Sequence, residues 1–136
     1  MDGLRRFRGE AKVSTPNSYD PAGGASSLSP AASLVRRNDP DRFLTALFAP
    51  AARRETLFVL YAFNSELARA RAVVSEPMLA LMRLHWWREV VEGARRRHEV
   101  AGPLGAALDA GALRAGDLAA LIDAREIEAE SVIETL

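Results

Sequence analysis

The chain has 136 residues, and its 18 basic residues (lysine plus arginine) balance 18 acidic ones, so the formal net charge is zero. This balance excludes the strong positive field typical of nucleic-acid-binding domains. The absence of cysteine excludes disulfides and thiolate metal sites and is typical of a reducing compartment. No stretch has the roughly 18 consecutive apolar residues of a membrane-spanning helix, and the length allows one domain.

The amino-acid composition of the chain changes near residue 28. Residues 1–27 are rich in Gly, Ser, Pro and Arg and poor in large apolar side chains, which is typical of segments that do not fold. We therefore expect a disordered arm over residues 1–27 and a helical domain over residues 28–136. A domain of roughly 110 residues buries only about two-thirds of the surface that its unfolded chain exposes. If such a domain leaves an apolar face uncovered, we expect the chain to self-associate.

Helix signals then follow in chain order. Asp39 and Pro40 are typical of an N-cap and a first-turn proline, and they open a short helix that runs through Phe48. Pro50 begins a longer helix whose segment 57–63 is apolar all round, which predicts burial on most sides. A strand would also explain seven apolar residues in a row, but the flanking Ala, Leu, Arg and Glu residues favour a helix.

The second half continues the helical pattern. One helix is expected over residues 78–96, followed by a turn at residues 102–103. A short helix over 104–110 ends at Gly111, a natural C-cap, and a last helix spans 116–130. Because no period-two strand pattern occurs, the fold class is all-α, with about five helices.

Few residues of these predicted helices have the spacing of a metal or catalytic site. His85 and Glu89 are spaced i, i+4 and could share a metal, but a histidine beside a tryptophan on an apolar face is more often a core or interface residue. Glu126 and Glu130 could bind magnesium if they faced a cavity and otherwise face water. No Ser–His–Asp or Cys–His set and no glycine-rich phosphate loop is present. Spacing alone therefore predicts no catalytic residue and no metal ligand.

Arginines cluster where the helical region begins. Guanidinium groups bind diphosphate through paired donors. A solvated face or ordinary ion pairs would explain the same pattern. The cluster comprises Arg36, Arg37, Arg42, Arg53 and Arg54.

Several motifs between residues 34 and 126, in this order and spacing, resemble the squalene/phytoene synthase family. They occupy residues 38–43, 48–54, 61–68 (Tyr-Ala-Phe-Asn-Ser-Glu-Leu-Ala), 74–77, 83–89 and 121–126. The resemblance implies a helical bundle of the isoprenoid (trans-prenyl diphosphate) synthase type, of which this chain would be the N-terminal half. Enzymes of this family condense two prenyl diphosphates head to head, using magnesium held by two aspartate-rich motifs.

The first aspartate-rich motif of the family matches positions that hold no carboxylate here. The resemblance places it at Ala68 and Ala72, which cannot bind a metal. Nearby, Glu66, Arg69 and Arg71 do not restore a carboxylate pair, and the two arginines would repel a cation. We therefore expect no cofactor. Mg²⁺ would bind only if a C-terminal half of the domain restored a metal site.

These departures resemble a non-synthase branch of the family, which includes a phytoene synthase-like complex I assembly factor and its bacterial relatives. The branch implies a non-catalytic protein acting in respiratory complex assembly or in isoprenoid or lipid binding. Two alternatives stay open: a farnesyl or geranylgeranyl diphosphate transferase with unusual ligands, and an inactive fragment. Asn64, Glu66, Arg83 and Trp87 are expected to line the inherited cavity as substrate-binding residues, with helix packing as their alternative role.

The branch also implies partners and a location. The partners would be a prenyl diphosphate or another lipid and subunits of respiratory complex I, with peripheral membrane contact and no nucleic acid. The location would be cytoplasmic, peripheral to the inner membrane.

Overall fold

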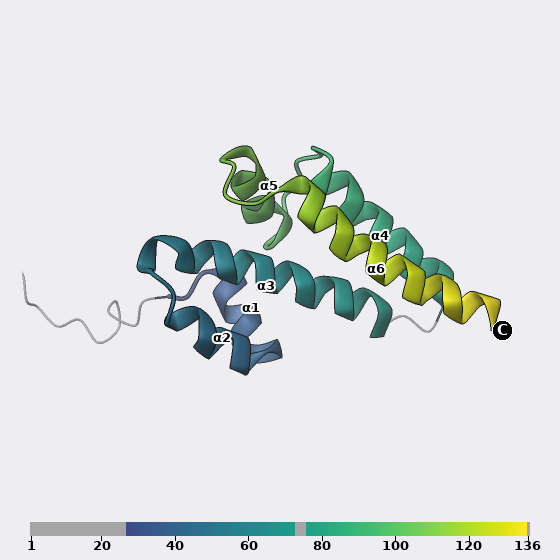
Figure 1. Cartoon of the computed structure of the whole chain (residues 1–136), viewed down its shortest axis with the longest axis horizontal. Coiled ribbons are helices and arrows are strands. Elements are labelled where there is room, and N and C mark those ends of the chain that lie inside the picture. The colour runs from purple at the N-terminus through teal and green to yellow at the C-terminus, as the bar shows by residue number, and fades with distance from the viewer. Residues whose placement is uncertain (1–26, 73–75, 136) are drawn as a thin grey trace, which may run out of the picture.

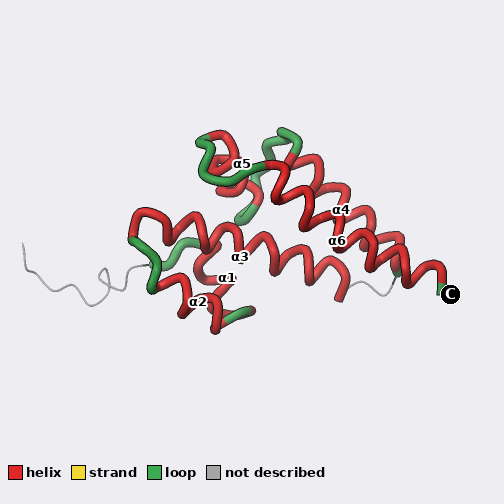
Figure 2. The backbone as a smooth tube through the Cα atoms, in the orientation of Figure 1, coloured by secondary structure: helices red, strands yellow, loops and turns green. Residues whose placement is uncertain are grey.

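The computed structural model describes residues 27–72 and 76–135, and within these ranges every regular element is a helix, as Figure 2 shows. The all-α prediction is confirmed. The arm expected over residues 1–27 lies, apart from Ser27, outside the described residues. The described helices are α1 (Pro30–Asn38), α2 (Pro40–Leu47), α3 (Ala51–Ala72), α4 (Pro77–Val91), α5 (Ala101–Asp109) and α6 (Ala115–Glu134).

Helix α3 lies at the centre of the arrangement (Figure 1). The α1–α2 pair packs against one side of it, and α4, α5 and α6 pack against the other. Helices α4 and α6 run antiparallel along each other, so the end of α6 lies beside the start of α4. Among the described helices, none combines the length and the apolar character that crossing a bilayer requires.

Capping side chains decide where the first two helices begin. The Ser29 Oγ accepts a hydrogen bond from the Ala32 N–H at 3.1 Å, and α1 begins at the next residue. The Asp39 carboxylate accepts from the Arg42 N–H at 3.2 Å, with Pro40 in the first turn of α2. The predicted start of α2 is therefore confirmed, and α1 is an additional helix that the sequence analysis did not bound.

The later helix boundaries differ from the expected ones. Helix α4 ends at Val91 rather than near residue 96, because Gly93 adopts a φ of 128° that continues no helix. Residues 102–103 were expected to form a turn but lie in the first turn of α5. A proline is tolerated there because the first helical N–H groups have no intrahelical acceptor. Gly111, at φ 74°, is confirmed as the left-handed residue just beyond α5.

The apolar segment of α3 supplies the middle of the core. Phe58, Val59, Ala62 and Phe63 are all buried, which confirms the expectation for segment 57–63. Leu67 extends the buried row toward the C-terminal half of the helix. The helices on either side of α3 cover these side chains with apolar residues of their own, among them Leu34, Val35, Leu84, Trp87, Leu104, Leu118 and Ile122.

An arginine bridges α4 to α6. The Arg88 guanidinium donates to the Glu126 carboxylate, with its Nη2 at 2.9 Å from Oε2, and also to the Asp123 carboxylate. The hydrogen bond to Asp123, followed by that to Glu126, raises the pKa of Arg88 above its usual value. Glu126 is therefore an ion-pair partner that is only partly exposed, whereas Glu130 is exposed, as expected.

A second arginine ties the loop after α4 to α5. The Arg95 guanidinium donates to both carboxylate oxygens of Asp109, from Nε at 3.0 Å and from Nη2 at 2.6 Å. Its Nη1 donates to the Val90 carbonyl at 3.1 Å. Gly105 permits this path, because a Cβ at that position would come within 2.8 Å of the Arg95 Cδ. The hydrogen bonds from Arg95 hold the pKa of the Asp109 carboxyl below its usual range.

Replacing Arg88 tests the bridge between α4 and α6. Arg88→Met should lower the free energy of unfolding by about 1–2 kcal/mol, because it leaves two carboxylates without their shared donor. The loss should shrink in 1 M salt. Urea unfolding followed by circular dichroism measures both effects. Arg97→Met, at an exposed position of the following loop, is the control, and an equal loss in both variants would contradict the bridge.

Gly105→Ala tests the path of the Arg95 side chain. Alanine is favoured over glycine within a helix by up to about 1 kcal/mol, but here the new methyl group would displace Arg95. The substitution should therefore stabilise the Arg95→Ala variant by about 1 kcal/mol more than it stabilises the parent chain. Gly102→Ala, whose Cβ would meet its nearest atom at 3.9 Å, should act equally in both backgrounds. Thermal unfolding of the parent chain, the two single variants Gly105→Ala and Arg95→Ala, and the double variant gives the coupling free energy between the two positions. A coupling of zero would show that Gly105 does not shape the path of the Arg95 side chain.

Candidate functional site

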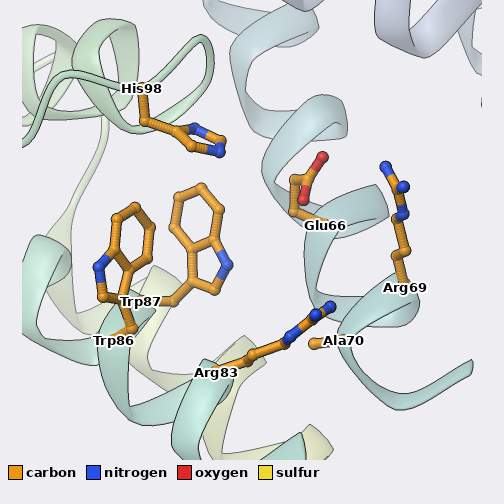
Figure 3. Close-up of a pocket in the computed structure, with 7 residues that line it drawn as sticks. All are labelled: Glu66, Arg69, Ala70, Arg83, Trp86, Trp87 and His98. Atoms are coloured by element: carbon orange, nitrogen blue, oxygen red, sulfur yellow. The ribbon is translucent and has the colours of Figure 1, made fainter. Parts of the chain in front are cut away.

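Two concavities flank the C-terminal half of α3. The first, which we call the aromatic hollow, has a volume of about 270 Å³ and opens between α3, α4 and the loop before α5 (Figure 3). Its lining residues are Glu66, Arg69, Ala70, Arg83, Trp86, Trp87 and His98.

Three rings form one wall of the aromatic hollow. Trp87 is only 4% exposed and makes an edge-to-face contact with Phe63 at 5.5 Å between ring centroids. The Trp86 ring lies across it at 4.8 Å, and the His98 ring lies 5.3 Å from Trp87. These edge-to-face contacts are a favoured geometry for aromatic pairs. The wall is therefore set by packing against the core of α3, and its shape does not depend on a ligand.

His98 is positioned by the start of α5. Its Nδ1 accepts hydrogen bonds from the Val100 N–H at 3.0 Å and the Ala101 N–H at 3.2 Å. An acceptor nitrogen carries no proton, so in the neutral ring the proton lies on Nε2. The side chain thus caps α5 and lines the aromatic hollow at the same time.

The opposite wall of the aromatic hollow is polar. Glu66 and Arg69 extend from α3, and Arg83 extends from α4 toward Ala70 (Figure 3). Beside the aromatic wall, the Arg96 guanidinium lies 5.3 Å from the centroid of the Trp86 ring. The hollow therefore offers aromatic surface on one side and charged groups on the other, an arrangement suited to an amphipathic ligand.

The second concavity, which we call the arginine cleft, lies where α3 faces the α1–α2 junction and α6, and it has a volume of about 600 Å³. Its lining residues are Asn38, Asp39, Arg42, Asn64, Ser65, Ala68, Arg69, Ala72 and Arg125. Asn64, Ala68 and Ala72 follow one another at four-residue intervals on α3, so they share one face of the helix.

The arginine cleft does not fit a magnesium ion. Ala68 and Ala72, the positions matched to the family's first aspartate-rich motif, both line it and offer no donor atom. Asp39 supplies the one carboxylate of the lining, and it already caps α2. Magnesium prefers carboxylate oxygens, whereas guanidinium groups repel it. Throughout the described part of the chain, no group of three or more His, Cys, Asp or Glu side chains has the geometry of a metal site.

The expected cavity residues separate into two places. Glu66, Arg83 and Trp87 line the aromatic hollow together, whereas Asn64 lines the arginine cleft. Arg69 lines both. The sequence analysis had named Arg69 only as a group that repels cations.

The sequence analysis also missed other contributors to these concavities, and two of them come from elements distant from α3 in sequence. It gave no role in a cavity to His98, which follows the end of α4, or to Arg125 on α6. No local pattern marks them, because each reaches its concavity only through helix packing.

The arginine cluster expected at the start of the helical region is not assembled at one place. Only Arg42 lines the cleft, whereas Arg54 donates to the Leu47 and Ala49 carbonyls at the α2–α3 corner. Arg36 lies over the Phe43 ring, at 6.0 Å from its centroid.

His85 and Glu89 do not form a metal site or a core contact. Their side chains are 3.5 Å apart, and that of His85 is 69% exposed, so His85 is not a core residue, and its role at an interface stays a prediction. Glu89 also accepts a hydrogen bond from Arg96. Its carboxylate is therefore committed to a cation of the chain itself.

Substituting His98 tests its double role. His98→Ala should lower the free energy of unfolding by about 1 kcal/mol, because two N–H groups at the start of α5 lose their acceptor. His98→Asn should recover most of the loss, since an amide oxygen can replace Nδ1 as the acceptor. Chemical denaturation compares the variants, and equal losses for both would argue against the cap.

Comparison with known proteins agrees with this architecture. The squalene/phytoene synthase family model matches residues 35–136. The proteins named NADH dehydrogenase (ubiquinone) complex I, assembly factor 6 from Homo sapiens and Bos taurus are 42% and 41% identical to this chain over 59 residues. That stretch covers 43% of this chain and 18% of each relative, and the Mus musculus protein of the same name is 39% identical over the same length. No solved structure matches significantly. Because the family match covers most of its length, the chain belongs to the squalene/phytoene synthase family.

Proposed function

We propose that this chain is a non-catalytic member of its family and acts in the assembly of a respiratory complex. The observation that carries the proposal is the lining of the arginine cleft, where Ala68 and Ala72 replace the carboxylates that would hold magnesium. Without a cation, the diphosphate leaving group of a prenyl substrate has no metal to neutralise its charge. The role in assembly is supported by the relatives, which are named as assembly factors of complex I.

The aromatic hollow supports binding rather than condensation. Its volume of about 270 Å³ lies near the lower limit of about 300 Å³ for small-ligand pockets. Such a space accommodates part of one isoprenoid or acyl chain, and two prenyl diphosphates would need far more. The Trp86 and Trp87 rings supply the apolar surface that such a chain would contact.

Exposed apolar side chains support a partner surface. Phe48, at the corner between α2 and α3, is 91% exposed, and Met78 and Met82 of α4 are 61% and 64% exposed. Met78 and Met82 are spaced i, i+4 on α4 and can form one exposed apolar patch, and such patches are typical of surfaces that contact a protein or a membrane. We propose subunits of complex I as the partners, supported by the names of the relatives, and a peripheral position at the inner membrane as the location.

A prenyltransferase is the second candidate, favoured by membership of the family itself. It differs from the proposal in one measurable respect. A transferase releases diphosphate from farnesyl or geranylgeranyl diphosphate in a magnesium-dependent reaction, whereas an assembly protein does not.

Assays on the purified protein separate these candidates. With either prenyl diphosphate and Mg²⁺, we expect diphosphate release no faster than in a blank without protein. Release that a chelator abolishes would overturn the proposal. A bona fide squalene synthase in parallel shows that the assay responds.

Deleting the gene tests the role in assembly. We expect less mature complex I on native gels and full recovery with the parent gene. Arg83→Gln, which alters an exposed lining residue of the aromatic hollow, should recover less than Arg97→Gln outside it. Normal complex I in the deletion strain would contradict the proposed role, and it is the outcome expected of an inactive fragment.

A further inference from the structure

Four polar groups of the aromatic hollow have no partner within the described part of the chain. The side chains of Glu66, Arg69 and Arg83 line the same space, yet none of them forms an ion pair or a hydrogen bond with another described residue. The fourth group is the indole Nε1–H of Trp87, which lacks an acceptor among the described residues although Trp87 is only 4% exposed. All four groups are therefore available to a ligand.

The side chains of the hollow donate more hydrogen bonds than they accept. Figure 3 shows the indole nitrogen of Trp87 directed toward the space between Glu66 and Arg83. The neutral His98 ring adds an Nε2–H, because its Nδ1 already accepts from two backbone N–H groups. The two guanidinium groups of the lining also donate, whereas among these side chains only the Glu66 carboxylate accepts. The hollow therefore favours a ligand group that is anionic and accepts hydrogen bonds.

The charge of the lining matches a single carboxylate. Two guanidinium groups, of Arg69 and Arg83, face one carboxylate, that of Glu66, which leaves an excess of one positive charge when His98 is neutral. A carboxylate head group balances this excess, and its two oxygens can accept paired hydrogen bonds from one guanidinium.

An exposed apolar strip leads away from the hollow along α4. It consists of Met78, Leu79 and Met82, which are 61%, 45% and 64% exposed. Met82 lies four residues before Trp86, so the strip and the aromatic wall share one side of the helix. From Met78 to Trp86 the helix rises by about 12 Å. A ligand with its head group in the hollow thus has a surface on which an apolar chain can lie.

We propose that the aromatic hollow and the apolar strip together bind a long-chain carboxylate, that is, a fatty acid. The carboxylate lies between the Trp87 N–H and the guanidinium groups of Arg69 and Arg83, and the acyl chain passes Trp86 onto the strip. Glu66 opposes the head group and limits the affinity. The inference rests on the proposed function only in placing a ligand in the hollow, and it does not depend on the role in complex assembly.

Fluorescence tests the position of such a ligand, because Trp86 and Trp87 are the two tryptophans of the chain. Bromine quenches tryptophan fluorescence on contact. Palmitate brominated beside the carboxylate should therefore quench the purified chain strongly and saturably. Palmitate brominated at the far end of its chain should bind equally well but quench less, because its bromine lies beyond the strip. Equal quenching by the two acids, or no saturable quenching, would overturn the inference.

Substitutions with opposite expected effects test the head-group site. Arg83→Gln should weaken palmitate binding about tenfold, and so should Trp87→Phe, which keeps an aromatic ring but removes the N–H donor. Glu66→Gln should strengthen binding by roughly threefold, because it removes the opposing charge. Arg97→Gln, at an exposed position outside the hollow, is the control and should bind as the parent chain does. Weaker binding by Glu66→Gln would mean that the hollow holds a cation or a zwitterion, contrary to the proposal.

Ligands that differ in head group or chain length test the two ends separately. Hexadecanol, which has no charge, should bind about tenfold more weakly than palmitate. Hexanoate should also bind more weakly, because its short chain leaves the strip uncovered. Met82→Gln should reduce the advantage of palmitate over hexanoate and leave hexanoate binding unchanged. An advantage that persists in full in Met82→Gln would contradict the assigned path of the chain.

Circular dichroism and thermal unfolding show whether each variant is folded. Absence of palmitate binding by the folded parent chain would refute the fatty-acid site. The role in assembly is judged separately by the amount of complex I in the deletion strain, so the two failures are distinguishable.

Discussion

Helix α3 is apolar around its whole circumference over residues 57–63, so this segment has to be covered from both sides. The α1–α2 pair and the α4–α6 pair meet that demand, and with α5 they enclose Phe63 and Leu67 completely. The polar residues of α3 therefore flank this segment, in the first turns of the helix and in its C-terminal half, where they lie at the edges between the covering helices. Both concavities lie there, and Arg69 lines each of them.

Arginine has two distinct uses in this fold. Arg54, Arg88 and Arg95 bind carbonyls or carboxylates of the chain and hold a corner, a helix pair and a loop in place. In the arginine cleft, guanidinium groups instead have weak partners or, among the described residues, no ion-pair partner. Charge that is committed inside the fold stabilises it, whereas charge gathered around a concave surface remains open to a ligand.

Sequence patterns predicted most of the local structure. The capping aspartate, the first-turn proline and the all-apolar segment specify α2 and α3 through backbone and side-chain chemistry that acts within a few residues. The errors occurred where that chemistry is weak or ambiguous. A proline in a first turn resembles a turn, as at Pro103, and the arginines after Gly93 extended an apparent helix beyond its true end at Val91.

The sequence by itself determined the helical class, the buried character of α3 and the absence of carboxylates at Ala68 and Ala72, because these depend on residue identity and short-range spacing. Only the tertiary structure decided which polar groups share a cavity. It brought Glu66, Arg83 and Trp87 together with His98, and it directed Asn64 to the other side of α3. It also brought Arg125 to the cleft, because the packing of α6 against α3 and α4 closes a sequence separation that no local pattern encodes.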